Sequence, residues 1–297
     1  MLDATRLRVL VAVARYGSVT AAAQALNYAQ PSISHHMARL EAETGAKLIE
    51  RSGRGIRLTE AGRLLAERAE EILGRLDAAE AELAAHVGLR QDRVRLVAFG
   101  AALATLGAAA ATAMAAERAA TDIQLTQADP ARALHMLRAG EADVAVVFRP
   151  MPDDSQPDLR YRELLDDPFY LLRPEGQDAA AGLTELAGQR WICGGGPHRD
   201  AVTALCRSAG FVPEIAVSAD DYVAVQALVA ARVGVSILPG LELRASRHPK
   251  VEATELAGAR RQVLAVSYGE PPDPPATAQL IEALVRSAES IDRAGVL

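Results

Sequence analysis

Residues 18–62 constrain this chain more than any other segment, because they carry the signals of two short helices, a tight turn and a basic hairpin in succession. Alanines at 21–23 allow close helix packing, residues 27–28 suit a turn, and Pro31 suits the first turn of a helix, where its missing N–H costs nothing. Two glycines within 48–58 then favour a hairpin. This order predicts a winged helix-turn-helix, which places one helix in the major groove of DNA.

Apolar residues recur at helical spacing on both sides of the turn, as in helices that bury one face. In the helix before the motif they are Leu7, Leu10, Val11 and Ala14. In the second helix of the motif they are Ile33, Met37 and Leu40. Gln30, Ser34 and His35 therefore fall on the outer face of that second helix.

Charge is distributed unevenly along the chain. The 297 residues carry a net charge of −6, yet residues 1–58 hold eight basic and four acidic side chains, a net +4, which leaves −10 for the remainder. A basic head on an acidic body predicts that only the head meets a polyanion. Arg51, Arg54 and Arg57 belong to this head and would be displayed on the hairpin.

A long helix is expected to begin at Thr59 and to run to about His86. A heptad pattern runs along it and comprises Leu65, Ala69, Ile72, Leu76, Ala79, Leu83 and His86. We interpret this seam as a dimerisation surface, because the opposite face is mostly Glu, Arg and Ala. The alternative is a single amphipathic helix packed on its own core.

The chain changes character at Gln91, where short apolar runs begin to alternate with helical patterns. This rhythm predicts an α/β fold with a parallel sheet and helices on both faces. A Pro- and Asp-rich stretch at 150–158 interrupts this rhythm and a second set of runs follows, so we expect two α/β lobes. The last helix is expected to return to the first lobe, so the chain would cross between lobes near 163–168 and near 267–270.

The motifs within residues 7–62 resemble those of the LysR-type transcriptional regulators. In order they are GSVTAAA, QP, a serine a few positions on, RLE, G, LIER, GRG and LTEAG. More loosely, LRAGEADVAVVF, AGFVPEI and DDYVAVQALVAARVGVSILPG are similar to the periplasmic-binding-protein-like effector domain of that family. The resemblance implies a sequence-specific DNA-binding regulator with a small-molecule effector between two lobes. It also implies an interrupted palindromic operator and a homo-oligomer, usually a tetramer built as a dimer of dimers.

Carried over position by position, the resemblance implies DNA contacts by Thr20, Gln30, Pro31, Ser34, His35, Arg51 and Arg54. Two positions depart from the family pattern. Ala29 stands where serine is usual, so a capping hydroxyl is missing, and His35 stands where Arg or Lys is usual. A neutral imidazole has one donor and cannot form the bidentate fork that reads guanine. The alternative for His35 and His36 is two solvated helix residues.

Ligands of open α/β sheets bind at the carboxyl ends of the strands. This rule selects as candidate effector-binding residues Phe99, Gly100, Ala101, Ala102, Thr126, Arg149, Gly195, His198 and Asp221. Because the acidic body would repel an anion, a carboxylate effector would need local positive groups. The amides of Gly194–Gly196 and the Arg149 guanidinium are the candidates; a flexible turn and a surface charge are the alternatives.

The expected organisation is a DNA-binding domain, a linker helix and an effector-binding domain, over 1–58, 59–90 and 91–297. Within the last domain, lobe 1 would comprise about 91–163 and 269–297, and lobe 2 about 164–268.

Two other classes of function are disfavoured. Cys193, His198 and Asp200 could suggest a thiol enzyme, but five residues across a turn rarely bring a nucleophile and a base together. A solute-binding protein would share the two lobes, yet the start of the chain does not read as a secretory signal and the head is basic. Two cysteines form no ligand cluster and no run of about 18 apolar residues is found, so we expect no catalytic residue, metal, cofactor or membrane span, and a cytoplasmic location.

Overall fold

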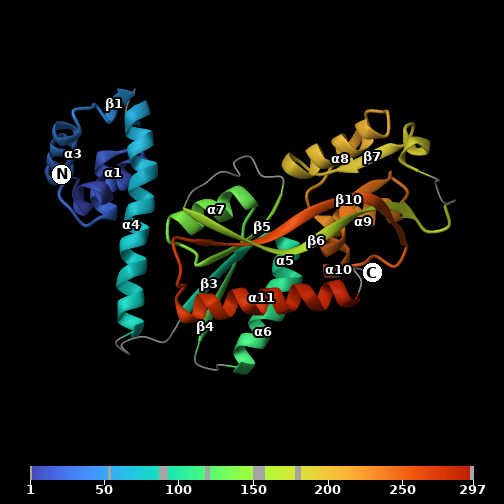
Figure 1. The fold of residues 1–297 in the computed structure, drawn as a ribbon. Coiled ribbons are helices and arrows are strands. Elements are labelled where there is room, and N and C mark those ends of the chain that lie inside the picture. The colour runs from blue at the N-terminus through green and yellow to red at the C-terminus, as the bar shows by residue number, and fades with distance from the viewer. Residues whose placement is uncertain are drawn as a thin grey trace. The chain divides into compact units, whose positions relative to one another are not determined.

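A computed structural model gives the fold (Figure 1) and describes residues 2–52, 55–86, 93–117, 121–149, 158–177 and 182–294. The chain divides into two compact units. The first comprises residues 1–91 with 135–142, and the second comprises residues 92–134 with 143–297. The first unit holds the expected winged head and long helix, and the second holds the α/β lobes.

The head begins with three helices, α1 (Ala4–Tyr16), α2 (Val19–Ala25) and α3 (Gln30–Thr44). The Asp3 carboxylate accepts hydrogen bonds from free amides at the start of α1, and the Ser18 hydroxyl accepts one at the start of α2. Gly17 ends α1 at a φ of 60°, a left-handed conformation that favours glycine. Local sequence therefore fixes where these helices begin and end.

Helix α3 starts directly after Ala29, which makes no side-chain cap hydrogen bond because it lacks a hydroxyl, as expected from the sequence. Its Ile33, Met37 and Leu40 are buried in the core of the head, which confirms the expected inner face. The opposite face of the helix is left exposed.

The hairpin expected after α3 consists of β1 (Ile49–Ser52) and β2 (Gly55–Leu58), paired antiparallel. Arg51 pairs with Ile56 across the two strands. Residues 53 and 54 at the tip of the hairpin lie outside the described part of the chain.

The long helix α4 (Glu60–His86) carries the heptad pattern, but the chain itself covers part of it. Leu65 and Ala69 pack against α1, so the dimerisation surface expected at these two positions is instead internal core. Further along, Ile72, Leu76 and Leu83 are exposed by 42%, 43% and 64%. The side chain of His86 lies outside the described part. The exposed stripe is thus shorter than the heptad pattern, because α1 competes for its first turns.

The second unit is built on one six-stranded sheet in the order β4-β3-β5-β10-β6-β9. Its strands are β3 (Arg93–Ala98), β4 (Asp122–Gln127), β5 (Val144–Arg149), β6 (Leu159–Pro174), β9 (Ser236–Pro239) and β10 (Val251–Tyr268). β3 pairs in parallel with β4 and β5, whereas β10 runs antiparallel to β5 and to β6. The expected parallel arrangement is confirmed for β3, β4 and β5, whereas the sheet as a whole is mixed, because β5, β10, β6 and β9 pair antiparallel in turn.

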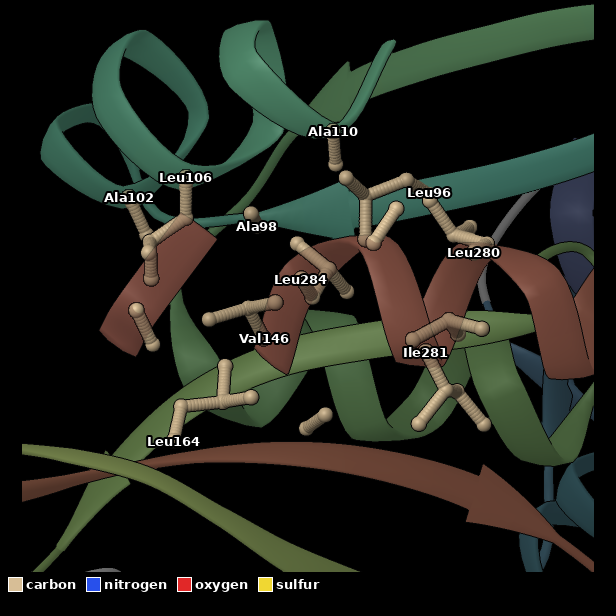
Figure 2. Close-up of a cluster of buried hydrophobic side chains, with 14 of the residues drawn as sticks. Leu96, Ala98, Ala102, Leu106, Ala110, Val146, Leu164, Leu280, Ile281 and Leu284 are labelled. Carbon is tan, nitrogen blue, oxygen red and sulfur yellow. The ribbon is translucent and has the colours of Figure 1, made fainter. Parts of the chain in front are cut away.

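The first lobe surrounds β3, β4 and β5. Its helical cover includes α5 (Gly100–Ala102), a π-helical turn (Leu103–Gly107), α6 (Ala108–Glu117) and the final helix α11 (Pro275–Ala294). Helix α7 (Pro130–Arg138) begins in the second unit, and its residues from 135 onward belong to the first unit. Figure 2 shows Leu96 of β3, Val146 of β5 and Leu284 of α11 meeting in one apolar core. The last helix therefore returns to the first lobe, as expected from the sequence.

The second lobe contains a small parallel sheet of β7 (Arg190–Cys193) and β8 (Glu214–Ser218). Around it lie a short 3-10 helix (Leu183–Leu186), α8 (Gly196–Ser208), α9 (Tyr222–Ala230) and α10 (Gly240–Ala245). Trp191 at its centre is fully buried and forms a bridge with Val235, just before β9.

The two lobes share the strands β6 and β10, which run without interruption through both (Figure 1). In β6 the side chains pass from the core of the first lobe to that of the second between Leu165 and Phe169. In β10 they pass between Ala259 and Val263, earlier than the expected crossing at 267–270. The earlier crossing follows from the long β-ribbon, in which Arg261 pairs with Asp167.

One helical segment, Gly100–Glu117, is long and apolar enough to cross a membrane by length and composition alone. Its Leu106, Ala110 and Met114 are buried in the core of the first lobe. A core helix of a soluble protein passes the same test, so the property is weak evidence for a membrane span.

Candidate functional site

The outer face of α3 presents the side chains expected to meet DNA. Gln30, Pro31, Ser34 and His35 are all exposed, opposite the buried side of the helix. The neighbouring His36 stacks on Tyr28 of the preceding turn, with ring centroids 6.0 Å apart, and contacts the ring of His35 edge-on at 6.2 Å. His35 therefore stands at the end of a short row of rings.

Two further candidates flank α3. Thr20 is exposed on α2, and Arg51 is exposed on the first strand of the wing. Arg57 on the second strand forms an ion pair with Glu50, with 2.6 Å between Nη2 and Oε1. Arg54 lies outside the described residues, so its expected contact stays a prediction.

In the first lobe, part of the expected effector site is core. Ala101 and Ala102 belong to the core of the first lobe and are at most 2% exposed, so they cannot contact a ligand. Gly100 faces the Gln127 side chain, because a Cβ at Gly100 would lie 3.3 Å from its Nε2. Thr126 is exposed on the edge strand β4. The four positions thus do not form one ligand-facing surface.

The glycine turn after β7 was expected to offer free amides, and its own chain uses two of them. The Gly194 N–H donates to His198 Nδ1 at 3.1 Å, and the Gly195 N–H donates to Asp220 Oδ1 at 2.6 Å. A carboxylate of the protein thus already occupies the anion position at Gly195. The expected anion site at Gly194 and Gly195 is therefore wrong as the structure stands.

His198 and Asp221 also have structural partners. Because His198 Nδ1 accepts from Gly194, its Nε2 carries the proton and donates to the Ile237 carbonyl at 2.8 Å. Asp221 caps α9 by accepting from the amides of Val223 and Ala224. His198 thus ties α8 to β9, and Asp221 holds a helix end.

Burial lowers the pKa of His198, and the positive charge of Arg261 lowers it further, against the hydrogen bond to Ile237 and the charge of Asp220. The imidazole is therefore neutral in the folded chain at neutral pH. Arg149 lies at the end of β5 with its guanidinium over the Tyr161 ring, 5.1 Å from the centroid.

The cysteines lack the properties of nucleophiles. Cys193 and Cys206 are both fully buried, and burial raises the pKa of each thiol to about 11. His198 Nδ1, 3.9 Å from the Cys193 sulfur, already accepts the Gly194 N–H. A thiolate would be scarce here at neutral pH.

A cluster lies where the lobes meet, and the sequence predicts none of its charged members; Phe99, an expected effector-binding residue, belongs to it. Arg261 of β10 is 6% exposed and donates from Nε to Asp167 of β6, which is fully buried, at 2.9 Å. Its guanidinium lies 4.9 Å from the Phe99 ring centroid and 4.6 Å from that of Phe148. Glu242 of α10 forms a second ion pair with Arg261, with 3.8 Å between Glu242 Oε1 and Arg261 Nη1. The detectable signal was charge inside otherwise apolar strands, as in DDP at 166–168 and ARR at 259–261.

A basic winged helix-turn-helix joined to a two-lobed α/β domain defines a class of DNA-binding regulators with a ligand-responsive part. Residues 4–63 match the family described as bacterial regulatory helix-turn-helix protein, lysR family, and residues 88–289 match the LysR substrate binding domain. The chain belongs to the LysR family of transcriptional regulators.

Relatives that match most of the chain are transcriptional regulators. The HTH-type transcriptional regulator TcbR of Pseudomonas sp. strain P51 is 30% identical over 97% of this chain and 100% of its own. TfdS of Cupriavidus pinatubonensis is 30% identical over 88% of this chain and 90% of its own. The crystal structure of CbnR, a LysR family transcriptional regulator, has a TM-score of 0.68 at 26% identity, covering 97% of this chain and 99% of that one.

A second structure, full-length CbnR complexed with its target DNA, has a TM-score of 0.68 at 25% identity and covers 96% of this chain and 100% of that one. These likenesses identify a DNA-binding transcriptional regulator with an effector-binding domain, and not an enzyme.

His198→Ala should lower the free energy of unfolding by roughly 1–3 kcal/mol, because it leaves the buried partners Gly194 N–H and Ile237 C=O unpaired. The parent's folded-state pKa for His198 lies below the unfolded value. The contribution of neutral His198 to the free energy of unfolding is therefore fully present above about pH 6.5, and it is lost as the pH falls through the lower pKa of the folded state. Denaturation at several pH values measures both effects, with His248→Ala as the control. An unchanged acid slope in His198→Ala would contradict the buried neutral imidazole.

Proposed function

We propose that this regulator binds DNA with the outer face of α3 in the major groove and the wing beside it. The contacts would be made by Thr20, Gln30, Pro31, Ser34, His35, Arg51 and Arg54. One observation carries the proposal: the polar face of α3 is exposed on the part of the chain that carries net positive charge. His35 would read a base with a single hydrogen bond rather than a fork.

We infer further that the chain forms a homo-oligomer, a tetramer built as a dimer of dimers, on an interrupted palindrome. The exposed stripe of Ile72, Leu76 and Leu83 on α4 supports a contact with a second copy, since contiguous exposed apolar surface commonly marks an interface. A two-fold dimer presents two heads, which matches a palindrome. A DNA target also supports a cytoplasmic location.

For the effector we propose a small ligand at the strand ends between the lobes. The proposed ligand class is a small carboxylate. The amides at Gly194 and Gly195 are already hydrogen-bonded within the chain, so they do not supply the positive group that it needs. Arg149 is then the candidate cation, at the end of β5. Such a ligand would act by shifting the relative angle of the lobes.

Arg54→Ala should weaken binding to the DNA upstream of this chain's own gene and reduce the salt dependence by roughly one ion, since one phosphate contact is lost. Gel-shift titrations at several salt concentrations measure both effects. The matched control is Arg57→Ala, because that guanidinium already pairs with Glu50 and should change less. Equal affinity of Arg54→Ala and the parent at every salt concentration would rule out the wing contact.

Leu76→Asp should dissociate the oligomer or cause aggregation, because a carboxylate cannot be solvated within an apolar interface. Sedimentation velocity measures the size distribution. Val212→Asp adds the same charge at a side chain that is 68% exposed in the second lobe, and it should size like the parent. A Leu76→Asp protein with the parent's size would contradict the α4 interface.

A thermal-shift screen of small carboxylic acids tests the effector proposal. An acid that stabilises the parent should bind at least about tenfold more weakly to Arg149→Ala, the scale of one lost charge-assisted hydrogen bond. Arg232→Ala, an exposed arginine of the second lobe, is the control. Unchanged affinity in Arg149→Ala would place the ligand elsewhere.

A further inference from the structure

The cluster around Arg261 joins three elements by short contacts. Arg261 on β10 donates to Asp167 Oδ2 on β6 at 2.9 Å, and Asp167 Oδ1 accepts from the backbone N–H of Leu241 on α10 at 2.9 Å. Asp167 is fully buried and Arg261 is 6% exposed. Removing either side chain would leave a buried charge unpaired, so the two depend on each other.

The same guanidinium is held from the side of the first lobe. Phe99 and Phe148, at the ends of β3 and β5, pack edge to face with ring centroids 5.1 Å apart, and both lie within 5 Å of Arg261 Cζ. Rings that cover a guanidinium attract its charge and exclude water from it. Arg261 Nη2 is buried and has no hydrogen-bond partner among the described residues.

This cluster lies where the shared strands pass from the core of one lobe to that of the other. The crossing in β6, at 165–169, contains Asp167, and the crossing in β10, at 259–263, contains Arg261, its partner across the two strands. The pairing of β6 with β10 is interrupted between Glu255 and Arg260. On α10, Leu241 packs in the core of the first lobe and Leu243 in that of the second. A change of lobe angle must therefore alter the surroundings of Arg261.

We propose that Arg261, Asp167 and Glu242 are positioning residues that hold the two lobes in one arrangement, and that ionisation of Glu242 weakens this hold. The proposal does not depend on the identity of the effector. With Glu242 neutral, the guanidinium faces one carboxylate and the cluster is balanced. With Glu242 ionised, the buried Asp167 and the partly buried Glu242, whose side chain is 19% exposed, share one cation, and the extra charge favours an arrangement that exposes Glu242 further to water.

The charges that face Glu242 are few. Arg261 approaches from β10 and Asp167 from β6. Of the described segments, those packed most extensively on α10 besides β6 are residues 100–107 and β9, and neither carries a titratable side chain. Burial raises the pKa of Glu242 to about 7, opposed by Arg261 and reinforced by Asp167. An acid whose pKa is raised in one arrangement favours that arrangement at low pH and disfavours it as pH rises through 7.

Energy transfer between the lobes tests this proposal in the full-length protein. Trp191, the single tryptophan, is the donor in the second lobe, and a thiol-reactive naphthalene dye on Ala116→Cys, at an exposed position of α6, is the acceptor. Both native cysteines are fully buried and so are shielded from labelling. Unlabelled protein supplies the donor-only reference at each pH.

Between pH 5.5 and 8.5 the transfer efficiency of the parent should change with a midpoint near 7. In Glu242→Gln it should stay at the low-pH value, and Glu270→Gln, at an exposed loop position, should titrate like the parent. Asp167→Asn should move the midpoint to lower pH, because one of two competing carboxylates is gone. Energy transfer from Trp191 of one subunit to the dye on another occurs in every variant alike, so it does not affect the comparison between variants.

A flat parent profile would overturn the proposal, and so would a Glu242→Gln profile that titrates like the parent's. Melting curves show whether each amide variant is folded. If Asp167→Asn fails to fold, Glu242→Gln, which leaves the Arg261–Asp167 pair intact, still decides. A midpoint that stays in place in folded Asp167→Asn would exclude a shared guanidinium.

Discussion

The antiparallel pairing of β6 with β10 is the constraint on which the rest of the second unit depends. The strands have 16 and 18 residues, and each packs one part of its length in the core of the first lobe and another part in the core of the second. The helices and the smaller sheet are then attached on either side. Because the lobes share this ribbon, a change of their relative angle is concentrated at its middle, and the most buried ion pair of the described chain lies there.

Much of the head is predictable from the sequence because its determinants are local. Asp3, Gly17 and Pro31 each act within a few residues of their own position, and the 3.6-residue period assigns Ile33 and Met37 to the core. The same holds for most helices and strands of the lobes. Periodicity alone does not say what covers an apolar stripe, which is why the heptad pattern predicts a dimer contact at Leu65 and Ala69 although α1 covers them.

The ribbon itself could not be predicted in this way. Charged residues such as Asp166 and Asp167 indicate a loop when their partners are unknown, and the partner of Asp167 stands 94 residues further along the chain. The candidate effector site failed for a related reason. The amides at Gly194 and Gly195 have the right position for an anion, but whether they are free depends on His198 and Asp220, and the fold supplies both as acceptors.

These internal bonds bear on how an effector can act. A ligand shifts a two-state equilibrium only by its difference in affinity for the two states, and a change from 1:99 to 99:1 requires a difference of about 10⁴-fold. Any interaction that already favours one lobe arrangement is part of what the ligand must overcome or exploit. A carboxylate approaching Arg261 would be the third around one guanidinium, next to Asp167 and Glu242. It would gain little there, whereas a ligand that separates Glu242 from Asp167 would relieve a repulsion that the folded chain already contains.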